Sequence, residues 1–557
     1  MALLPTKARE PGDRIPMSSL SIPAAAALPP SSASDGGTLR LLAASLVLVP
    51  LTLSPLLWAS VPPLVDYPNH LARMWILAQN GAVPELAQNY VVAWRLLPNL
   101  AMDLIVPALA QIMPLEIAGR LFIALTMLSL LAGTMTLHRA LHGRLSLWPL
   151  SALLFLYNAA LFWGFLNCLF GIGMFLLAFS GWIASRHWSA APRIITFAAI
   201  ASLLLILHLF AFCLYALAVG TYEIGLWLRE RQVSLRGFLT LCAAGLQFVP
   251  GSMLWLASLW NFRASYTRYG DLAAKAYAMQ APFTFGPTVI PLDRAVLIFS
   301  LGFLMVAIIA RVLKPVPEMR LPLIAMVLAA AAMPTWLSSS WLSDIRLPVA
   351  LPFVLIASTR LDAARFRAVV WFAALAVVLL SVRVWAVSET WRDLDRRFAE
   401  FRSASQAIAP GARLLIVGDE PTDGRPFEGV PDFLARQRDQ MFSNLAALAV
   451  IDRAAFIPSL FTGAAPVRPA PRNAGLFHTQ TELLSPELLA RSMTPEQMAS
   501  LDVGPNFLGE LPYWGVWPKN FDFVVWIDFG ETPTPELTPL RLVASGSFFR
   551  LYRVIRR

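Results

Sequence analysis

The residues best suited to chemistry lie in one short segment, 65–73 (VDYPNHLAR). Asp66 can accept a proton or bind a divalent cation, and His70 can donate or accept a proton or bind a metal. Arg73 carries a planar guanidinium that suits a phosphate. Pro68 is typical of the first turn of a helix, which would place Asp66 just before that helix. His70 and Arg73, three residues apart, would then share one of its faces.

The same segment has a structural interpretation, in which Asp66 only caps the helix and Arg73 only anchors it at the level of the lipid headgroups. Spacing alone does not separate the two interpretations. Charged groups near a bilayer are costly, which favours a functional role. We therefore take Asp66 and His70 as candidate catalytic residues, and Tyr67, Asn69 and Arg73 as candidate substrate-binding residues.

Further candidate substrate-binding residues are polar groups near the ends of apolar runs: Asn167, His208, Arg263, Arg268, Asp344 and Arg346. Each has a structural alternative. His208 could be a packed histidine, and Arg263 and Arg268 could lie in a solvated basic loop. The segment 343–348 (SDIRLP), which holds Asp344 and Arg346, could only cap and anchor a helix. The glycines that flank Asn167 could indicate close helix packing.

The elements that must position these residues are membrane helices. Of the 557 residues, 57% are hydrophobic and only 14% are charged, so a soluble protein of this composition could not cover its surface. Eleven apolar runs are candidate spans: 39–60, 117–137, 146–160, 162–184, 193–209, 211–228, 237–259, 292–313, 320–338, 346–360 and 367–388. The stretch 193–228 could instead form one long tilted helix.

Charge in the connections predicts the orientation. With a cytoplasmic N-terminus, the inner connections hold 13 Arg and Lys against three acids, Glu230, Glu318 and Asp362. This is the positive-inside bias. Three segments would then face outward: the loop 61–116, the loop 260–291, and the region from about 390 to 557. Within the first loop, 99–113 resembles a helix lying at the membrane interface.

The C-terminal region changes in character. The runs 412–417 (ARLLIV) and 523–527 (FVVWI) predict short buried strands, and 548–555 (FFRLYRVI) alternates as an edge strand would. Helices are expected over 432–448 and 486–500. The predicted organisation is a disordered cytoplasmic tail over 1–38, a helical membrane domain over 39–390, and an extracytoplasmic α/β domain over 391–557.

Composition and motifs argue against several classes of function. The net charge of +10 comes from single basic residues in short connections, which is unlike the basic face of a nucleic-acid-binding protein. The three cysteines lie in apolar runs and show no zinc spacing. The chain contains no Walker signature, kinase motif set or Ser-His-Asp order.

The layout resembles the GT-C class of integral-membrane glycosyltransferases, which use sugars carried on polyprenyl phosphates. The likeness rests on Asp66 in the first outer loop, on 115–137 (LEIAGRLFIALTMLSLLAGTMTL) with Arg120, and on 344–351 (DIRLPVAL). The first run is similar to the family's Ala-Ala-Arg-Leu entry to its second helix, and the last to its Arg-Tyr-Leu-Leu-Pro element. One departure is that Tyr67 follows Asp66 where the family often has a second acid; Asp103 is a distant substitute.

This resemblance implies inverting transfer of a sugar from a polyprenyl-phosphate carrier to a lipid, glycan or protein acceptor at the outer face of a bacterial inner membrane. Asp66 would be the base or would orient the acceptor, either directly or through a divalent cation. One or two of Arg73, Arg263, Arg268 and Arg346 would hold the phosphate. Two alternatives remain open: a transporter or flippase of a lipid-linked glycan, and a non-catalytic envelope assembly protein.

Overall fold

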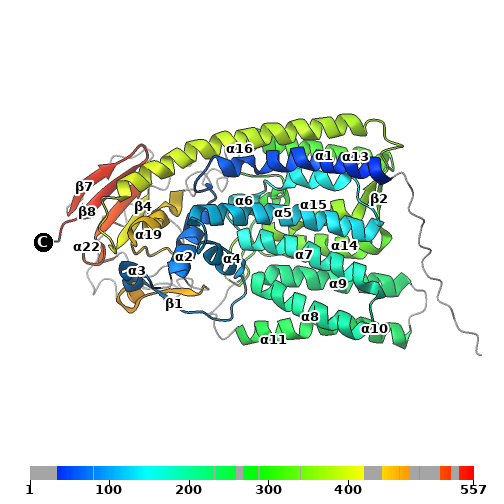
Figure 1. The fold of residues 1–557 in the computed structure, drawn as a ribbon, viewed down its shortest axis with the longest axis horizontal. Helices are drawn as coiled ribbons and strands as arrows, with labels where there is room; N and C mark the ends of the chain where they lie inside the picture. The colour runs from blue at the N-terminus through cyan, green and yellow to red at the C-terminus, as the bar shows by residue number, and fades with distance from the viewer. Residues whose placement is uncertain are drawn as a thin grey trace, which may run out of the picture.

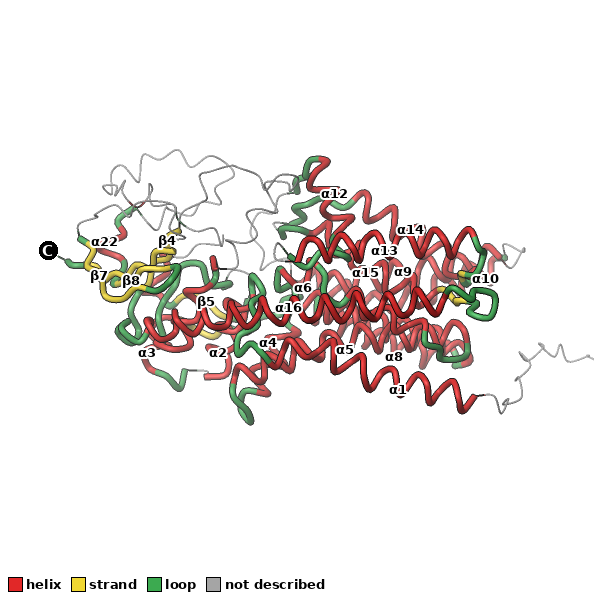
Figure 2. Tube along the Cα trace, turned by 90° about the horizontal axis from the view of Figure 1, so that it is seen from above, coloured by secondary structure: helices red, strands yellow, loops and turns green. Residues whose placement is uncertain are grey.

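The computed structural model describes residues 34–79, 81–229, 234–258, 267–286, 289–338, 340–418, 442–462, 465–476, 484, 489, 515–527 and 539–556. The protein is a multi-span helical membrane protein with a mixed β-sheet in its C-terminal region. Helices fill most of the molecule, and the larger sheet lies at one end of it (Figure 1, Figure 2). The predicted disordered tail falls almost wholly outside the described residues.

Eight helices in the described part of the chain are long and apolar enough to cross a membrane. They are α1 (Ser34–Leu53, continued by a 3-10 turn, Ser54–Leu57), α5 (Leu115–His142), α7 (Leu166–Ala184), α8 (Ala190–Leu207), α9 (Leu209–Arg229), α10 with α11 (Leu235–Gly245 and Val249–Ser258), α13 (Ile290–Ile309) and α16 (Val369–Ser405). The segment 193–228 is therefore two helices, because His208 has extended backbone angles that end α8.

Three of the eleven predicted spans are helical but shorter than a full crossing. The run 146–160 forms a 3-10 helix (Trp148–Phe155) followed by the single turn α6 (Ala159–Phe162). The other two are α14 (Arg320–Ala332) and α15 (Ser343–Ser358). Pro334 follows α14 closely, and proline disfavours helix in the residue before it. Helix α15 is mostly buried and packs inside the bundle rather than against lipid.

The first outer loop and the C-terminal region form one body. The loop contains α2 (Tyr67–Gln79), α3 (Pro84–Asn89), β1 (Tyr90–Val92) and α4 (Ala101–Leu109). Strand β1 pairs antiparallel with β5 (Val467–Pro469). The outer segment 267–286 contributes α12 (Leu272–Gln280). At the other end of the bundle, β2 (Leu313–Pro315) pairs with β3 (Thr359–Leu361).

The C-terminal sheet has the strand order β4-β6-β8-β7, in which β4 (Leu414–Gly418) is parallel to β6 (Phe523–Ile527). Strand β8 (Phe549–Val554) is antiparallel to both β6 and β7 (Leu540–Ser545). The prediction of β8 as an edge strand is wrong, since β7 covers it. Short helices α19 (Leu448–Arg453) and α22 (Trp517–Asn520) flank the sheet. The helix predicted over 432–448 lies mostly outside the described residues, as does that over 486–500.

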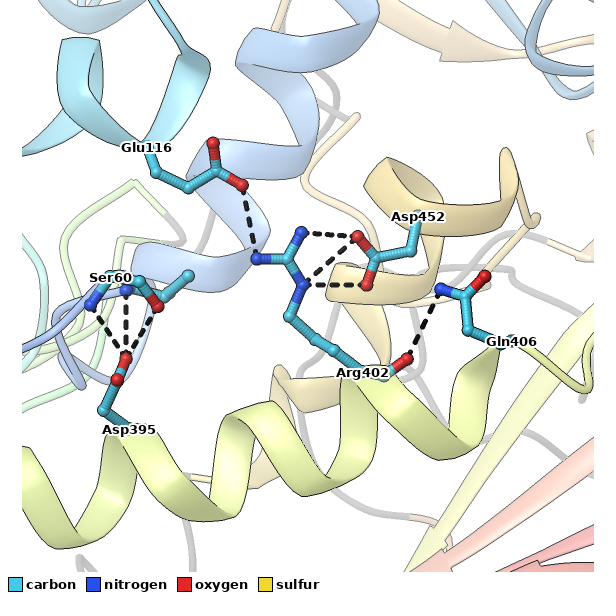
Figure 3. Close-up of polar contacts among 7 residues, drawn as sticks. Ser60, Glu116, Asp395, Arg402, Gln406 and Asp452 are labelled. Atoms are coloured by element: carbon cyan, nitrogen blue, oxygen red, sulfur yellow. Dashed lines mark hydrogen bonds and ion pairs between the residues drawn. The ribbon is translucent and has the colours of Figure 1, made fainter.

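Helix α16 joins the membrane part to the C-terminal region without a break, through residue 390, where the sequence predicts a domain boundary. In Figure 3, Arg402 on this helix contacts Asp452 at 2.5 Å and Glu116, at the start of α5, at 3.2 Å. Asp395 accepts hydrogen bonds from the backbone N–H and the hydroxyl of Ser60. The helix is thus fastened to the first outer loop, to α5 and to α19.

Candidate functional site

Asp66 is held by its backbone against the turn between α6 and α7. The N–H of Asp66 donates to the carbonyl of Trp163 (3.2 Å), and the N–H of Val65 donates to that of Phe162 (2.9 Å). Gly164 has φ +81°, and a Cβ added to it would lie 3.0 Å from the Asp66 nitrogen and 3.1 Å from the Asp66 Cβ. Only glycine fits this turn, because a side chain would be strained there and would push Asp66 away.

The side chain of Asp66 is half-buried. Burial raises its pKa to about 7, opposed by the positive charge of Arg73 and by a hydrogen bond from Asn444. Desolvation disfavours the charged form of a carboxyl group. A group with this pKa exchanges its proton near neutral pH, as a general base or acid requires.

His70 lies one turn further along α2, and its N–H donates to the Asp66 carbonyl at 3.0 Å. Burial and the charge of Arg73 hold the pKa of its imidazole well below the usual value, so the ring is neutral. Its edge faces Phe461, and Nδ1 has no hydrogen-bond partner among the described residues. His70 is therefore a neutral polar group beside the candidate acid.

Arg73 does not offer a free charge to a substrate. Its Nε lies 2.8 Å from Asp103 Oδ1 and its NH2 donates to Oδ2 at 2.9 Å, with both side chains buried. This ion pair joins α2 to α4. Because Asp103 compensates the charge of Arg73, the structure disfavours Arg73 as the phosphate ligand, and it leaves Asp103 no role as a second catalytic acid.

Two other predicted residues of this segment point into protein. The Asn69 side chain is fully buried and bonds Asn444, Ser459 and the N–H of Phe461. Tyr67 is fully buried, and its hydroxyl lies against Gly119. The sequence pattern of α2 could not predict the burial of Asn69, because the C-terminal region covers the polar face of this helix. Both residues serve packing, in contrast to the predicted substrate contacts.

Among the candidate arginines in the described residues, Arg346 is the one best suited to bind an anionic ligand. Its guanidinium lies 5.3 Å from the ring centroid of Phe165 and donates to Ser340 Oγ at 2.6 Å. Among the described residues no carboxylate lies within ion-pair distance of it, and its buried Nε has no hydrogen-bond partner. Asp344 accepts a hydrogen bond from Thr335 and pairs with Lys275 at 3.9 Å instead. Arg346 thus has no ion-pair partner among the described residues, and Asp344 is the carboxylate that acts on its charge from a longer distance.

The turn 163–165 contacts both the acid and this cation. Its first residue, Trp163, bonds Asp66, and its last, Phe165, lies under Arg346. The Cα atoms of these two turn residues are at most about 7.6 Å apart, since consecutive Cα atoms are separated by about 3.8 Å. Trp163 also donates to the Tyr277 hydroxyl (3.0 Å) and packs edge-on against Trp341. The sequence does not single out these aromatic residues, since apolar side chains are common throughout the chain.

The remaining candidates divide into structural residues and residues away from this turn. Asn167 accepts from the Met102 N–H and donates to the Asn99 carbonyl, which fixes the start of α4. His208 Nδ1 accepts from the Phe210 N–H and so caps α9. Arg268 is exposed, and its backbone pairs with Trp336. Arg263 lies outside the described residues.

Among the described residues, those around Asp66 do not form a metal site. In the described ranges, no group of three or more His, Cys, Asp and Glu side chains could hold one. Mg²⁺ takes oxygen ligands, and here Asp66 is one carboxylate with a donor amide beside it. We therefore derive the chemistry from the side chains alone.

No protein-family model matches this chain, and no curated protein matches it by sequence. Two solved structures are similar to it, both of ArnT from Cupriavidus metallidurans. The apo form has 12% sequence identity and a TM-score of 0.47, covering 94% of this chain and 99% of that one. The form bound to undecaprenyl phosphate has 12% identity and a TM-score of 0.45, covering 93% and 98%.

Proposed function

We propose that this protein is a membrane glycosyltransferase that moves a sugar from a polyprenyl-phosphate carrier to an acceptor hydroxyl, with inversion at the anomeric carbon. The observation that carries the proposal is that one turn, 163–165, contacts both Asp66 and Arg346. Asp66 has a pKa near 7 and Arg346 has no ion-pair partner within the described residues. The resemblance of the first outer loop, of 115–137 and of 344–351 to GT-C enzymes supports the same reading.

In this mechanism the acceptor oxygen attacks the anomeric carbon from the side opposite the carrier. The new carbon–oxygen bond forms as the bond from the anomeric carbon to the phosphate oxygen breaks. Asp66 takes the acceptor proton and later releases it to water. The carrier phosphate leaves as an anion, which Arg346 stabilises. The leaving group is already a stable anion, so orientation and charge stabilisation suffice for the protein.

Of the four arginines that the resemblance offers for the phosphate, Arg73, Arg263, Arg268 and Arg346, we propose Arg346. We place the N-terminus in the cytoplasm of a bacterium and the C-terminal region outside its inner membrane, following the charge bias of the connections. The site then lies at the outer ends of α2 and α15, where a carrier headgroup and an extracytoplasmic acceptor can meet.

A transporter would need polar groups near the middle of the membrane. The buried pair Arg383–Asp293 does not meet this need, because Asp293 lies in the first turn of α13. Arg383 is also held by protein groups, since it donates to the carbonyls of Leu154 and Phe283 besides Asp293, and its Nε has no partner among the described residues. We read this pair as a link between α13 and α16.

The test uses purified protein in proteoliposomes with a panel of radiolabelled polyprenyl-phosphate hexoses and pentoses and a cell-envelope extract as acceptor. Asp66→Asn should lower transfer by about 10²–10⁴-fold, the usual value of a positioned general base. Arg346→Ala should lower it while Arg346→Lys restores part of it. Transfer by Asp66→Asn at the wild-type rate would overturn the proposal.

A further inference from the structure

Asn444 brings the C-terminal region into direct contact with the candidate acid. Its side chain is 1% exposed and lies 378 residues along the chain from Asp66. Its Nδ2 donates to the Val65 carbonyl at 2.9 Å and reaches Asp66 Oδ1 at 3.5 Å. The region that the sequence predicts as a separate domain therefore supplies a polar group to the site.

The orientation of the Asn444 amide is fixed by its neighbours. Asn69 Oδ1 accepts from the backbone N–H of Phe461 at 2.8 Å, so the other end of that amide must be the donor. Asn69 Nδ2 then donates to Asn444 Oδ1 at 2.9 Å. This leaves Asn444 Nδ2 directed at the Val65 carbonyl and the Asp66 carboxyl group. A flipped Asn444 would place two amide donors against each other.

We propose that Asn444 is a positioning residue for Asp66: it holds the carboxyl group at the turn 163–165 and favours its charged form through the Nδ2 donor. Its catalytic meaning rests on the proposed function, whereas its effect on Asp66 does not. The C-terminal region is then part of the site and not only a platform for the acceptor.

The charged groups near Asp66 in the described residues are not placed to position its carboxyl group as Asn444 does. On α2, Arg73 is compensated by Asp103 and His70 is neutral. On α5, Glu116 and Arg120 act on Tyr67, and Glu116 is also paired with Arg402. The turn 162–165 carries no ionisable side chain. Besides its own burial, the described groups that act on the Asp66 carboxyl are thus Arg73 and Asn444.

The experiment compares Asn444→Ala and Asn444→Asp with wild type. Loss of the donor in Asn444→Ala should move the acid limb of the pH–rate profile up by about 0.5–1 unit. Asn444→Asp keeps the shape of the side chain and the acceptor for Asn69, so it should fold. It places a second carboxylate beside Asp66 and should move the limb by more than about 1 unit. Unchanged midpoints in both variants would overturn the proposal.

Asn89→Ala is the matched control. Asn89 is also fully buried and also ties the first outer loop to the C-terminal region, through the carbonyls of Gly411 and Ala454. It does not bond Asp66, so its loss should lower stability and leave the midpoint of the acid limb unchanged. An equal shift in Asn89→Ala would mean that Asn444 acts only through general loosening, against the proposal.

A second readout separates this inference from the proposed function. A hydrophobic carbodiimide reacts with protonated carboxyl groups, and mass spectrometry of the Asp66 peptide gives the labelled fraction against pH. The midpoint of labelling should rise in both Asn444 variants, with or without transferase activity. If no carrier supports transfer but the labelling midpoints shift, the function fails and the positioning role stands. If transfer occurs and neither midpoint shifts, the positioning role fails alone.

Discussion

At the scale of single residues, charge compensation decides which side chain can act on a substrate. Arg73 and Arg346 are both buried or half-buried arginines, but only Arg73 has an ion-pair partner, Asp103, among the described residues. A buried ion pair is strongly destabilised by the loss of one partner. Arg73 is therefore held in a structural pair, which leaves Arg346 as the arginine that we propose for an anionic ligand.

The raised pKa of Asp66 predicts how rate and stability depend on pH. The rate should rise with pH and level off above a midpoint of about 7, as Asp66 loses its proton. Folding should be favoured by the bound proton, so stability is present at low pH and is lost as pH rises from about 4 through 7. The stability of Asp66→Asn should not fall over this pH range, because the amide side chain does not ionise.

The stability arm is measured as the difference in unfolding free energy between Asp66→Asn and wild type in detergent. This difference should grow in favour of the variant between pH 5 and pH 8. One pKa unit corresponds to about 1.4 kcal/mol, and solvent near a half-buried group reduces this, so we expect about 1–2 kcal/mol in total. A difference that stays constant with pH would contradict the raised pKa.

At the scale of elements, the turn between α6 and α7 sets the place of the acid. Glycines on α5 and α7 do pack closely, as the sequence indicates: a Cβ on Gly133 would lie 2.8 Å from the Gly173 carbonyl oxygen. Gly164 has a different purpose, because its left-handed conformation lets the turn bond Asp66.

Gly164→Ala should therefore lower activity by about 10²-fold, since misplacement of a catalytic group by about 1 Å has an effect of that size. Gly143→Ala is the matched control. Gly143 also has a left-handed φ, +72°, but has open space around it. Both variants should lose about 1–2 kcal/mol of stability from backbone strain. Equal activity in the two purified variants would show that contact with Asp66 has no role.

At the scale of the whole molecule, α16 connects the bundle to the sheet (Figure 1). Its outer half carries Arg402, which bridges α5 and α19, and Asp395, which holds Ser60 (Figure 3). The segment that contains Asn444 and α19 is thereby held over the first outer loop. The geometry at Asp66 thus depends on contacts made far from it.

Arg402→Met should loosen this arrangement by about 1–2 kcal/mol, because Asp452 and Glu116 lose a partly buried partner. Hydrogen exchange in α19 and β4 should speed up, while exchange in α5 and α7 should stay the same. Arg397→Met is the control, since Arg397 pairs with Asp393 on the same helix. Similar exchange in both variants would argue against the bridge.

The sequence by itself determined the membrane-spanning character, most helices, three of the sheet strands and the position of Asp66 just after the first span. These follow from local properties, namely the length of an apolar run, alternation along a strand and the charge of a connection. A run of hydrophobic residues needs no distant partner to be recognised.

Only the tertiary structure decided which polar groups are free. Asn69 and Arg73 have the side chains expected of site residues. In the structure, however, Asn69 is hydrogen-bonded to Asn444, and Arg73 forms an ion pair with Asp103. Asn444 acts on Asp66 only because β1 pairs with β5 and α16 brings the C-terminal region back over the first loop. Whether a charge is paired or an amide is hydrogen-bonded depends on which segments meet in space. A local sequence pattern cannot predict a partner that lies several hundred residues away.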